Sequence, residues 1–480
     1  MGLSSVFDLA ARALRAQDVV LQTTGHNIAN VDRPGYSRQE AVLVSEDAQR
    51  LRGTIVGSGV AVDYVRQEVD ALVEAQLLRA RSSSAEASAA RDELARLESI
   101  FGDVSGSGLQ DVLDAFFASA DDLALHPQGM AERTALLARA ETLATRFSDR
   151  AAELAELQRQ LDEGVTAAVA EVNGLVDEIA RLNNEIYSAE IGEHHANDLR
   201  DQRREALGEL SELIGITQFE TDGQVTVIGP DGWPLVYRDG ATHLVADTTT
   251  APTLTGLDGR ALSQLGFEVG NGDFVAFSDP VEGGKLGGLL RVRDTDIPSI
   301  AGRLDQLAAS LAAAVNAVHT SGEDLDGNAG GAVFGGTAAS SLTVLITDPR
   351  QVAASAATTP PALPTPEDNQ NALALAAVSS AALDGTDPAL GSADLGGATL
   401  VGFLASTIAA AGTLSQTATD SADAADSVTV QLEARRAEIS GVSTNEELIK
   451  LLDAQRAFQA AAVLVNTATA ALDSLLEMVQ

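Results

Sequence analysis

The chain is 480 residues long, enough for roughly two to four domains that each bury a core. It carries 31 Lys and Arg residues against 69 Asp and Glu residues, and a net charge of −38 argues against phosphate backbones and anionic lipid headgroups as partners. Because there is no cysteine, disulfides, thiolate metal ligands and cysteine nucleophiles are excluded.

Composition also bears on fold class and compartment. Aromatic residues make up only 4% of the chain, while alanine and leucine are abundant, as is typical of helical bundles. No apolar run approaches the ~20 residues that span a bilayer, so we expect no membrane insertion. Charged residues at 8, 12, 15 and 18 interrupt the N-terminal stretch, which lacks the pattern of a cleaved secretory signal. We expect a chain that is either cytoplasmic or exported with its N-terminus uncut.

The first predicted element is an N-terminal helix with a narrow apolar stripe. Its members follow alternating steps of four and three residues: Leu3, Phe7, Ala10, Leu14, Gln17, Leu21, Thr24 and Ile28. This is the seam pattern of a coiled coil, narrower than the stripe of an ordinary surface helix. A turn-rich block over 27–39 follows. The stripe therefore needs a partner helix.

The next segments alternate between short extended pieces and long helices. Residues 39–44 and 54–65 have the period of strands. Helical patterns then cover 69–81, resume at Leu94 and Leu97 after a serine run, and continue over 109–125, 133–187 and 198–213. The pattern over 133–187 is longer than ~25 residues, which favours a bundle over a lone globular helix.

A region of period two, residues 214–285, interrupts the helices. We predict strands at 225–228, 235–237 and 274–277, with turn chemistry at 229–232. Helix resumes over 299–319. A glycine-rich loop over 322–336, a short strand over 342–346 and a proline-rich exposed connector over 358–370 come next, followed by helices over 371–380 and 399–439.

The final helix begins at a capping-box sequence, Ser443-Thr444-Asn445-Glu446. Its apolar stripe alternates steps of three and four: Leu448, Leu451, Gln455, Phe458, Ala462, Val465, Thr469, Leu472, Leu476 and Val479. Left exposed, this stripe would exceed the roughly 400 Å² of apolar surface that a monomer tolerates. We therefore expect both terminal helices to be buried, against each other or against neighbouring molecules.

These patterns predict a mainly α, discontinuous multi-domain protein with a small inserted β domain. The terminal coiled-coil domain comprises residues 1–66 and 440–480, the helical bundle 67–213 and 286–439, and the β-rich insert 214–285.

Signals of catalysis or metal binding are weak. Asp324-Leu325-Asp326-Gly327-Asn328 is similar to the start of a calcium loop, but Ala329 replaces the required glycine and Gly335 the bidentate glutamate. His194 and His195 with Asp198 lie at a helix–helix turn and lack an H-E-x-x-H arrangement. Gly106-Ser107-Gly108 completes no phosphate-binding motif, and no serine has the context of a nucleophile elbow. We predict no enzyme activity and no cofactor.

Both termini resemble the bacterial flagellar axial proteins, the family of rod, hook and hook-associated proteins. The N-terminal motifs are Leu3-Ser4-Ser5, His26-Asn27-Ile28-Ala29-Asn30 and Pro34-Gly35-Tyr36-Ser37-Arg38-Gln39, and the last of these is similar to the hook-associated group. Residues 196–203, 287–290, 293–294, 325–331, 368–375, 439–443, 446–447 and 455–461 also resemble this group. The likeness is thin over 214–285 and 336–366.

The resemblance implies a non-enzymatic building block, exported through the flagellar type III apparatus with an uncleaved signal and located outside the cell at the hook–filament junction. Its implied partners are copies of itself in a ring at the hook tip, the hook protein, the next hook-associated protein and an export chaperone that recognises the C-terminal helices. The expected assembly interface comprises Leu3, Phe7, Leu14, Leu21, Ile28, Asn30, Pro34, Gly35, Tyr36, Leu448, Leu451, Phe458, Val465, Leu472, Leu476 and Val479.

Two departures concern the outer surface and a turn. Asp32-Arg33 stands where the family commonly has Thr before the proline, and the β insert is small beside that of longer members. Two other interpretations stay open: a rod or hook subunit, and an exported enzyme or calcium-dependent adhesin.

Overall fold

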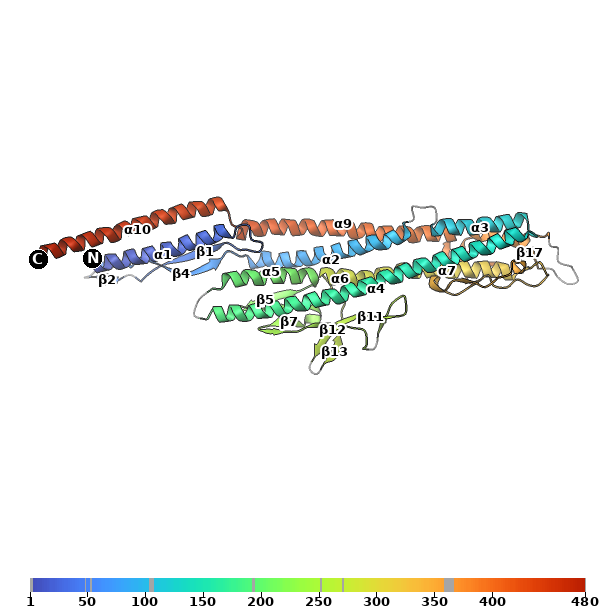
Figure 1. Ribbon diagram of the computed structural model, residues 1–480, viewed down its shortest axis with the longest axis horizontal. Helices are drawn as coiled ribbons and strands as arrows, with labels where there is room; N and C mark the ends of the chain where they lie inside the picture. The colour runs from blue at the N-terminus through green and yellow to red at the C-terminus, as the bar shows by residue number, and fades with distance from the viewer. Residues whose placement is uncertain are drawn as a thin grey trace.

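The computed structural model describes residues 3–47, 49–51, 54–102, 108–191, 195–250, 253–269, 272–357 and 367–479. The molecule is a long rod in which helices run nearly parallel to one axis (Figure 1). The helices are α1 Leu3–Ala29, α2 Ala71–Phe101, α3 Leu109–Leu125, α4 Met130–Ala189, α5 Asn197–Leu213, α6 Gly284–Arg291, α7 Ile297–Thr320, α8 Gln370–Ala377, α9 Leu400–Ser440 and α10 Thr444–Val479.

The strands are short and form small antiparallel sheets. Near the N-terminus lie β1 Gln39–Ser45, β2 Gln49–Leu51, β3 Thr54–Val56 and β4 Val60–Gln67. The insert holds β5 Thr217–Thr221, β6 Gln224–Ile228, β7 Pro234–Tyr237, β8 Gly240–Ala241, β9 Leu244–Asp247, β10 Leu254–Thr255, β11 Ala261–Leu262, β12 Gln264–Val269 and β13 Asp273–Ala276. Two-residue strands β14 Gly322–Glu323, β15 Phe334–Gly335, β16 Thr343–Val344, β17 Ser355–Ala356 and β18 Leu383–Asp384, with β19 Asp394–Ala398, complete the set.

Most predicted elements are confirmed, and two expectations change. Helix α2 is unbroken through its serine run, where Ser82 is buried, and α9, α6 and α5 pack against this helix. The helix expected to start at residue 299 instead begins at Gly284: α6 continues through one π turn, Val292–Asp296, into α7. The three glycines of α6 interrupt the apolar periodicity, so the sequence pattern did not predict this helix. The connector expected over 358–370 lies largely outside the described residues, as do the Gly106-Ser107 pair and His194.

Glycine in α6 has a packing role. A Cβ atom at Gly288 would lie 2.4 Å from the carbonyl oxygen of Glu86 and 3.0 Å from the Cβ atom of Ala89. The backbones of α6 and α2 are therefore in direct contact, which a larger residue would prevent. The motif at 287–290 marks this crossing.

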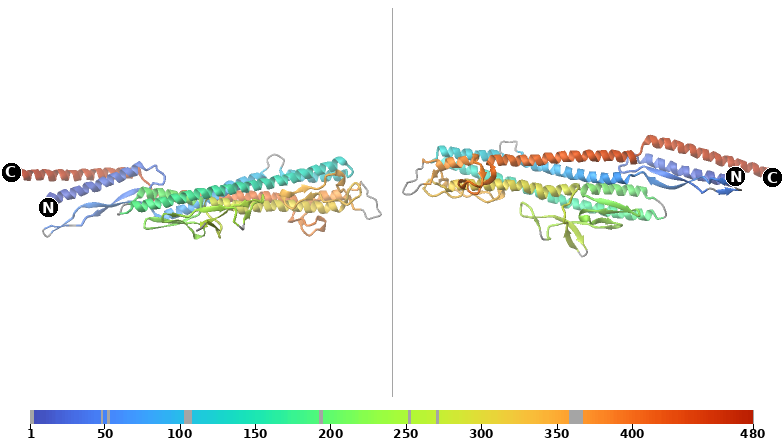
Figure 2. Two further views of the ribbon diagram at one scale, coloured as in Figure 1. Left: turned by 60° about the horizontal axis from the view of Figure 1, so that its bottom comes forward. Right: turned by 180° about the vertical axis from the view of Figure 1, so that it is seen from behind.

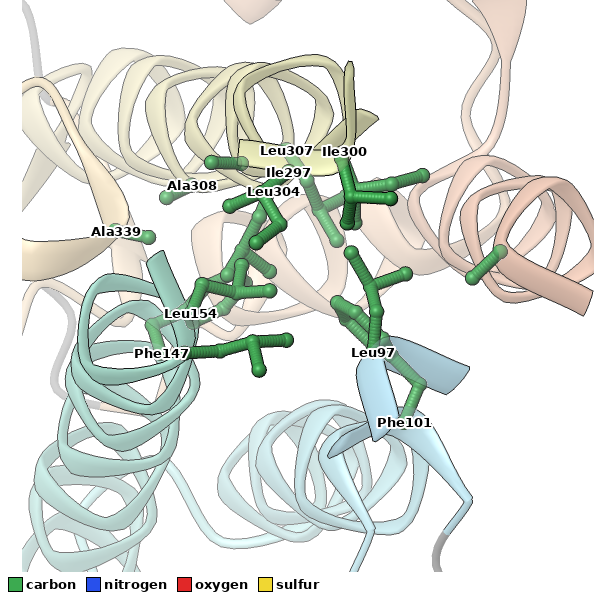
Figure 3. Packing of buried hydrophobic residues seen from close by; sticks show 14 of the residues in the cluster. Leu97, Phe101, Phe147, Leu154, Ile297, Ile300, Leu304, Leu307, Ala308 and Ala339 are labelled. Atoms are coloured by element: carbon green, nitrogen blue, oxygen red, sulfur yellow. The ribbon is translucent and has the colours of Figure 1, made fainter. Parts of the chain in front are cut away.

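One hydrophobic core runs along the bundle. Phe147 and Leu154 of α4 meet Leu97 of α2 and Ile300 and Leu304 of α7 at its centre (Figure 3). The buried side chains of the insert belong to the same cluster: Val225, Val227, Leu235, Val236, Leu244, Leu265 and Phe267. The insert therefore packs on α4 rather than forming a core of its own.

Side-chain hydrogen bonds fix the insert along α4. Asn173 forms a two-way pair with the backbone of Leu244, at 2.8 and 2.9 Å. Asn183, fully buried, forms the same kind of pair with Val225, at 2.7 and 3.1 Å. Because neither α4 nor the insert strands can satisfy these amides alone, the contact sets one docking position.

The terminal helices extend beyond the bundle at one end, where both chain ends lie (Figure 2). Among the described residues, one stretch, Leu400–Ser474, is long and apolar enough to cross a membrane by length and composition alone. The stretch meets this criterion through the average hydropathy of its alanine-rich helices, without a continuous apolar run of that length. A core helix of a soluble protein passes the same test, and the absence of membrane insertion stays a prediction.

Candidate assembly interface

Helices α1 and α10 lie side by side and antiparallel, as the neighbouring N- and C-termini show (Figure 1). The β1–β4 hairpin covers another side of α1. Small side chains form the buried line of α10 at seven-residue spacing: Ala454, Ala461 and Ala468. The predicted partnership of the two terminal helices is therefore present within one chain.

The buried line of α10 lies one residue before part of the predicted stripe. Leu448 is 48% exposed, Phe458 36% and Leu472 40%, so the pairing with α1 does not bury them. Small alanines rather than these large residues allow the close approach to α1. Leu451 and Val465 are half-buried, as are Phe7, Leu14, Leu21 and Ile28 of α1. The side chains of Leu3, Leu476 and Val479 lie outside the described part of the chain.

A buried polar cluster joins the end of α1 to the start of α10. The Asn27 side chain is 1% exposed. Its amide nitrogen donates to the carbonyl of Gln39 at 2.8 Å and to the carboxylate of Glu447 at 2.9 Å. Its amide oxygen accepts from the hydroxyl of Tyr36 at 2.8 Å and from the backbone N–H of Gln39 at 2.9 Å. Every hydrogen-bonding position of the amide is used.

Glu447 is the second centre of this cluster. Its carboxylate is 1% exposed and also accepts from Arg38 Nε at 2.9 Å. The backbone N–H of Arg38 donates to the carbonyl of Ser440 at 2.8 Å, at the end of α9. A buried carboxylate needs such charge-assisted partners. The N-terminal motif thus holds the α9–α10 connection from one side.

The same motif contacts α5 on its other side. The backbone N–H of Ser37 donates to Asp201 at 3.2 Å, and Arg204 binds both Asp201 and the Ser37 hydroxyl. Gln39 Nε2 donates to Asp198 at 3.1 Å. The terminal helices and the bundle are therefore joined through side chains of 37–39.

Burial and nearby carboxylates keep the Tyr36 hydroxyl protonated in this junction. Burial raises the pKa of the Tyr36 hydroxyl, and the carboxylates of Asp198, Asp201 and Glu447 raise it further. Burial likewise raises the pKa of Asp201, which Arg204 opposes. Tyr36 therefore stays protonated and able to donate to Asn27 at any physiological pH.

The turn at 30–36 connects the end of α1 to the largely buried residues 36–39. Asn30 donates from its side chain to the carbonyl of His26 at 2.9 Å, at the end of α1. Pro34 is exposed, and Gly35 adopts a φ of 75°, which favours glycine. Arg436 of α9 donates to the Gly35 carbonyl at 3.2 Å and pairs with Glu74 at 2.7 Å.

The structure thus brings together residues that the sequence placed in separate motifs. Tyr36 and Gly35 were predicted for the interface; Asn27, Arg38, Gln39, Asp198, Asp201, Arg204 and Glu447 were not. The position of Asn27 on the buried side of a helix could have indicated this cluster, because a buried side-chain amide needs hydrogen-bond partners.

The other candidate sites have structural roles. Asp324 accepts from the backbone N–H groups of Asp326 and Asn328, both at 2.8 Å, and Asp326 pairs with Arg350. His195 packs against the ring of Tyr64, with centroids 4.9 Å apart. Within the described residues there is no group of three His, Cys, Asp or Glu that could hold a metal ion.

Comparisons with known proteins agree with this architecture. The family model "Flagellar hook-associated protein FlgK helical domain" matches residues 94–334, and "Flagellar basal body rod FlgEFG protein C-terminal" matches residues 434–478. Flagellar hook-associated protein 1 of Salmonella typhimurium is 31% identical over 332 residues, which cover 68% of this chain and 59% of that protein. The chain thus matches less than two thirds of that relative's length.

Two further matches cover more of the chain. Flagellar hook-associated protein 1 of Bacillus subtilis is 25% identical over 515 residues, covering 99% of this chain and 97% of the relative. The flagellar hook junction protein FlgK from Burkholderia pseudomallei has a structure that aligns with a TM-score of 0.66 at 16% identity, over 76% of this chain and 100% of that chain. This second match shows a shared fold.

Proposed function

The chain belongs to the family of flagellar hook-associated protein FlgK, and from this premise we propose that it is a structural, non-enzymatic subunit that joins the hook of a bacterial flagellum to its filament. The observation that carries the proposal is the junction at Asn27 and Glu447, which holds both chain termini as one projecting unit on the bundle. Such a unit suits a contact made in an axial assembly.

The exposed side of α10 supports assembly through this unit. Leu448, Ile449, Leu452, Val463 and Leu464 are each 48–61% exposed in the single chain. An apolar surface of this extent on one helix marks an interaction site. We propose that neighbouring copies cover it in a ring at the hook tip, where α10 completes the inner layer.

The proposed partners follow from this position. They are further copies of the chain, the hook protein below, and the next hook-associated protein above, on which flagellin then assembles. We further propose export through the flagellar apparatus with an uncleaved N-terminus, a location outside the cell, and recognition of the C-terminal helices by an export chaperone.

A deletion strain tests the function. We expect hooks of normal length without filaments and flagellin lost to the medium, seen by electron microscopy and by immunoblot of the culture supernatant. Complementation with the intact chain should restore filaments. Normal filaments in the deletion strain would overturn the proposal, and loss of the hook itself would favour a rod or hook subunit instead.

A truncation tests the role of the terminal unit. A chain ending before Leu448 should remain a soluble monomer, because the bundle core does not include α10, and it should fail to join isolated hooks. Assembly of this truncated chain on hooks would contradict the proposed role of α10.

A further inference from the structure

A groove between α2 and α9 has charges that differ from the rest of the surface. It encloses about 890 Å³ and is lined by Ala80, Val428 and Leu432, with Arg79 and Arg435 at its sides. Val428 is 49% exposed. Glu438 is the one acidic residue in the lining, so the groove is locally positive in a chain of net charge −38.

The two groove arginines have no ion-pair partner among the described residues. Their neighbours do: Arg81 pairs with Glu433 at 2.9 Å, and Arg436 with Glu74 at 2.7 Å. With more than twice as many acidic as basic residues in the chain, an unpaired, exposed arginine pair on an apolar groove is suited to an incoming carboxylate.

A second surface with complementary properties lies on the insert. A cleft of about 580 Å³ lies between the end of α4 and the tips of the β5–β6 and β7–β8 hairpins. Tyr187 and Phe219 are each 53% exposed and Tyr237 is 58% exposed. Asp222, Arg238 and Asp239 line the same cleft, so the lining has one net negative charge, and neither aspartate has an ion-pair partner in the described part of the chain. Tyrosine is enriched among the residues that contribute most of the binding energy at protein interfaces, where a partner covers them.

The hairpin tips are held rigidly. Asp222 and Arg238 have φ values of 52° and 58°, two of the three non-glycine residues with positive φ among those described. Buried Asn183 donates to the carbonyl of Arg238 at 2.7 Å, and Arg203 donates to the carbonyl of Gly223 at 2.7 Å. These hydrogen bonds from Asn183 and Arg203 hold the two turns in place, so binding of a partner would cost little conformational entropy at the hairpin tips.

We propose that the α2–α9 groove of one copy receives the hairpin tips of the next copy in the ring, an inference that rests on the proposed function. Tyr237 and Phe219 would cover the apolar floor, and Asp222 and Asp239 would meet Arg79 and Arg435. The groove lies between α2 and α9 on one side of the rod. The cleft lies on the other side, where the insert packs on α4 (Figure 1). A contact between two different surfaces of identical copies is heterologous and generates rings when it closes.

Cross-linking in assembled flagella tests this contact, because the natural chain has no cysteine. The double variant Val428→Cys with Tyr237→Cys, treated with a short bismaleimide, should give a ladder of dimers and larger multimers on denaturing gels. The control double variant Leu125→Cys with Tyr237→Cys has its first site at the end of α3, which is 73% exposed against 49% for Val428, and should nevertheless stay monomeric. A monomeric test variant in a strain that still forms filaments would overturn the contact while leaving the proposed function standing.

A charge exchange tests the same pairing without cross-linker. Arg435→Glu and Asp239→Arg should each reduce filament number on a complemented deletion strain, and the combination should restore a large part of it. Arg139→Glu, the same charge change at an exposed site of α4, should leave filaments at the wild-type number. Unaffected single variants, or a combination no better than either, would overturn the proposal.

Discussion

The side chain of Asn27 donates a 2.9 Å hydrogen bond to that of Glu447, 420 residues later in the chain. Both side chains are 1% exposed and lie where α1 ends and α10 begins. A single buried polar pair in a helix–helix interface fixes register, because any shift leaves the amide and the carboxylate without partners. The pair therefore sets how the two ends of the chain meet.

The first prediction concerns this pair. Asn27→Ala should loosen α1 and α10 from the bundle, because Tyr36, Gln39 and Glu447 each lose a buried partner at a cost of about 1–3 kcal/mol per unsatisfied group. Amide hydrogen exchange should then rise in α1 and α10 and stay unchanged in α4. Gln22→Ala removes an exposed side chain that donates to Asp18 and serves as the control. Equal exchange in both variants would show that the junction has no such role.

The second prediction uses two glycines. Gly288→Ala should lower the free energy of unfolding by about 1–3 kcal/mol, because its new Cβ overlaps the carbonyl oxygen of Glu86. Gly302→Ala, in the second turn of α7, has no atom within 4 Å of its Cβ position and should raise stability by roughly 0.5–1 kcal/mol. Denaturant unfolding compares the two. A destabilising effect at both sites would contradict the packing argument.

Local patterns account for most of the helices. The run from Leu154 to Ile186 has one buried side throughout, and proline at 127 ends α3. The helix at Gly284–Arg291 could not be predicted from local periodicity, because glycine is rare inside helices. Its glycines are there because the backbone of α2 lies in direct contact with them, which depends on tertiary structure. The buried line of α10 was displaced for a similar reason: alanine at 454, 461 and 468 carries little hydrophobic signal but allows close approach.

The assembly site was predictable only in part. Resemblance pointed to residues 34–39 and 196–203 separately, while the contact between Ser37 and Asp201 depends on how α5 folds back along α4 and meets the segment that follows α1. Apolar residues were predicted for the interface because burying a large apolar side chain contributes more free energy than a typical hydrogen bond. The polar residues that join the parts, such as Gln39 and Asp198, gain their role only from partners distant in sequence.

The third prediction concerns the attachment of the insert. Asn183→Ala should raise amide hydrogen exchange in β6, because the buried backbone of Val225 and the guanidinium of Arg203 lose their partner. Asn173→Ala should do the same in β9, where Leu244 is held, and leave β6 protected. The two variants thus serve as controls for each other. Uniform loosening of the whole insert by either one would show that it docks as a single rigid unit instead.

The last prediction is a pH dependence at His319. This side chain is fully buried; its Nε2 accepts from the backbone N–H of Ala353 at 2.8 Å, and its Nδ1 donates to the carbonyl of Gly331 at 2.7 Å. Burial lowers the pKa of His319 below its ordinary value of 6.5, and Arg133 lowers it further, while Asp324 and the Gly331 carbonyl oppose the shift.

The sign follows from proton binding. The folded chain holds His319 neutral, whereas the unfolded chain takes up a proton there below pH 6.5, so its contribution to stability is complete above that pH and falls as the pH drops through and below it. His319→Gln removes the titrating ring. The melting temperature of the wild-type chain should therefore fall more steeply than that of the variant between about pH 6.5 and 5. Parallel curves would mean that His319 is protonated equally in both states.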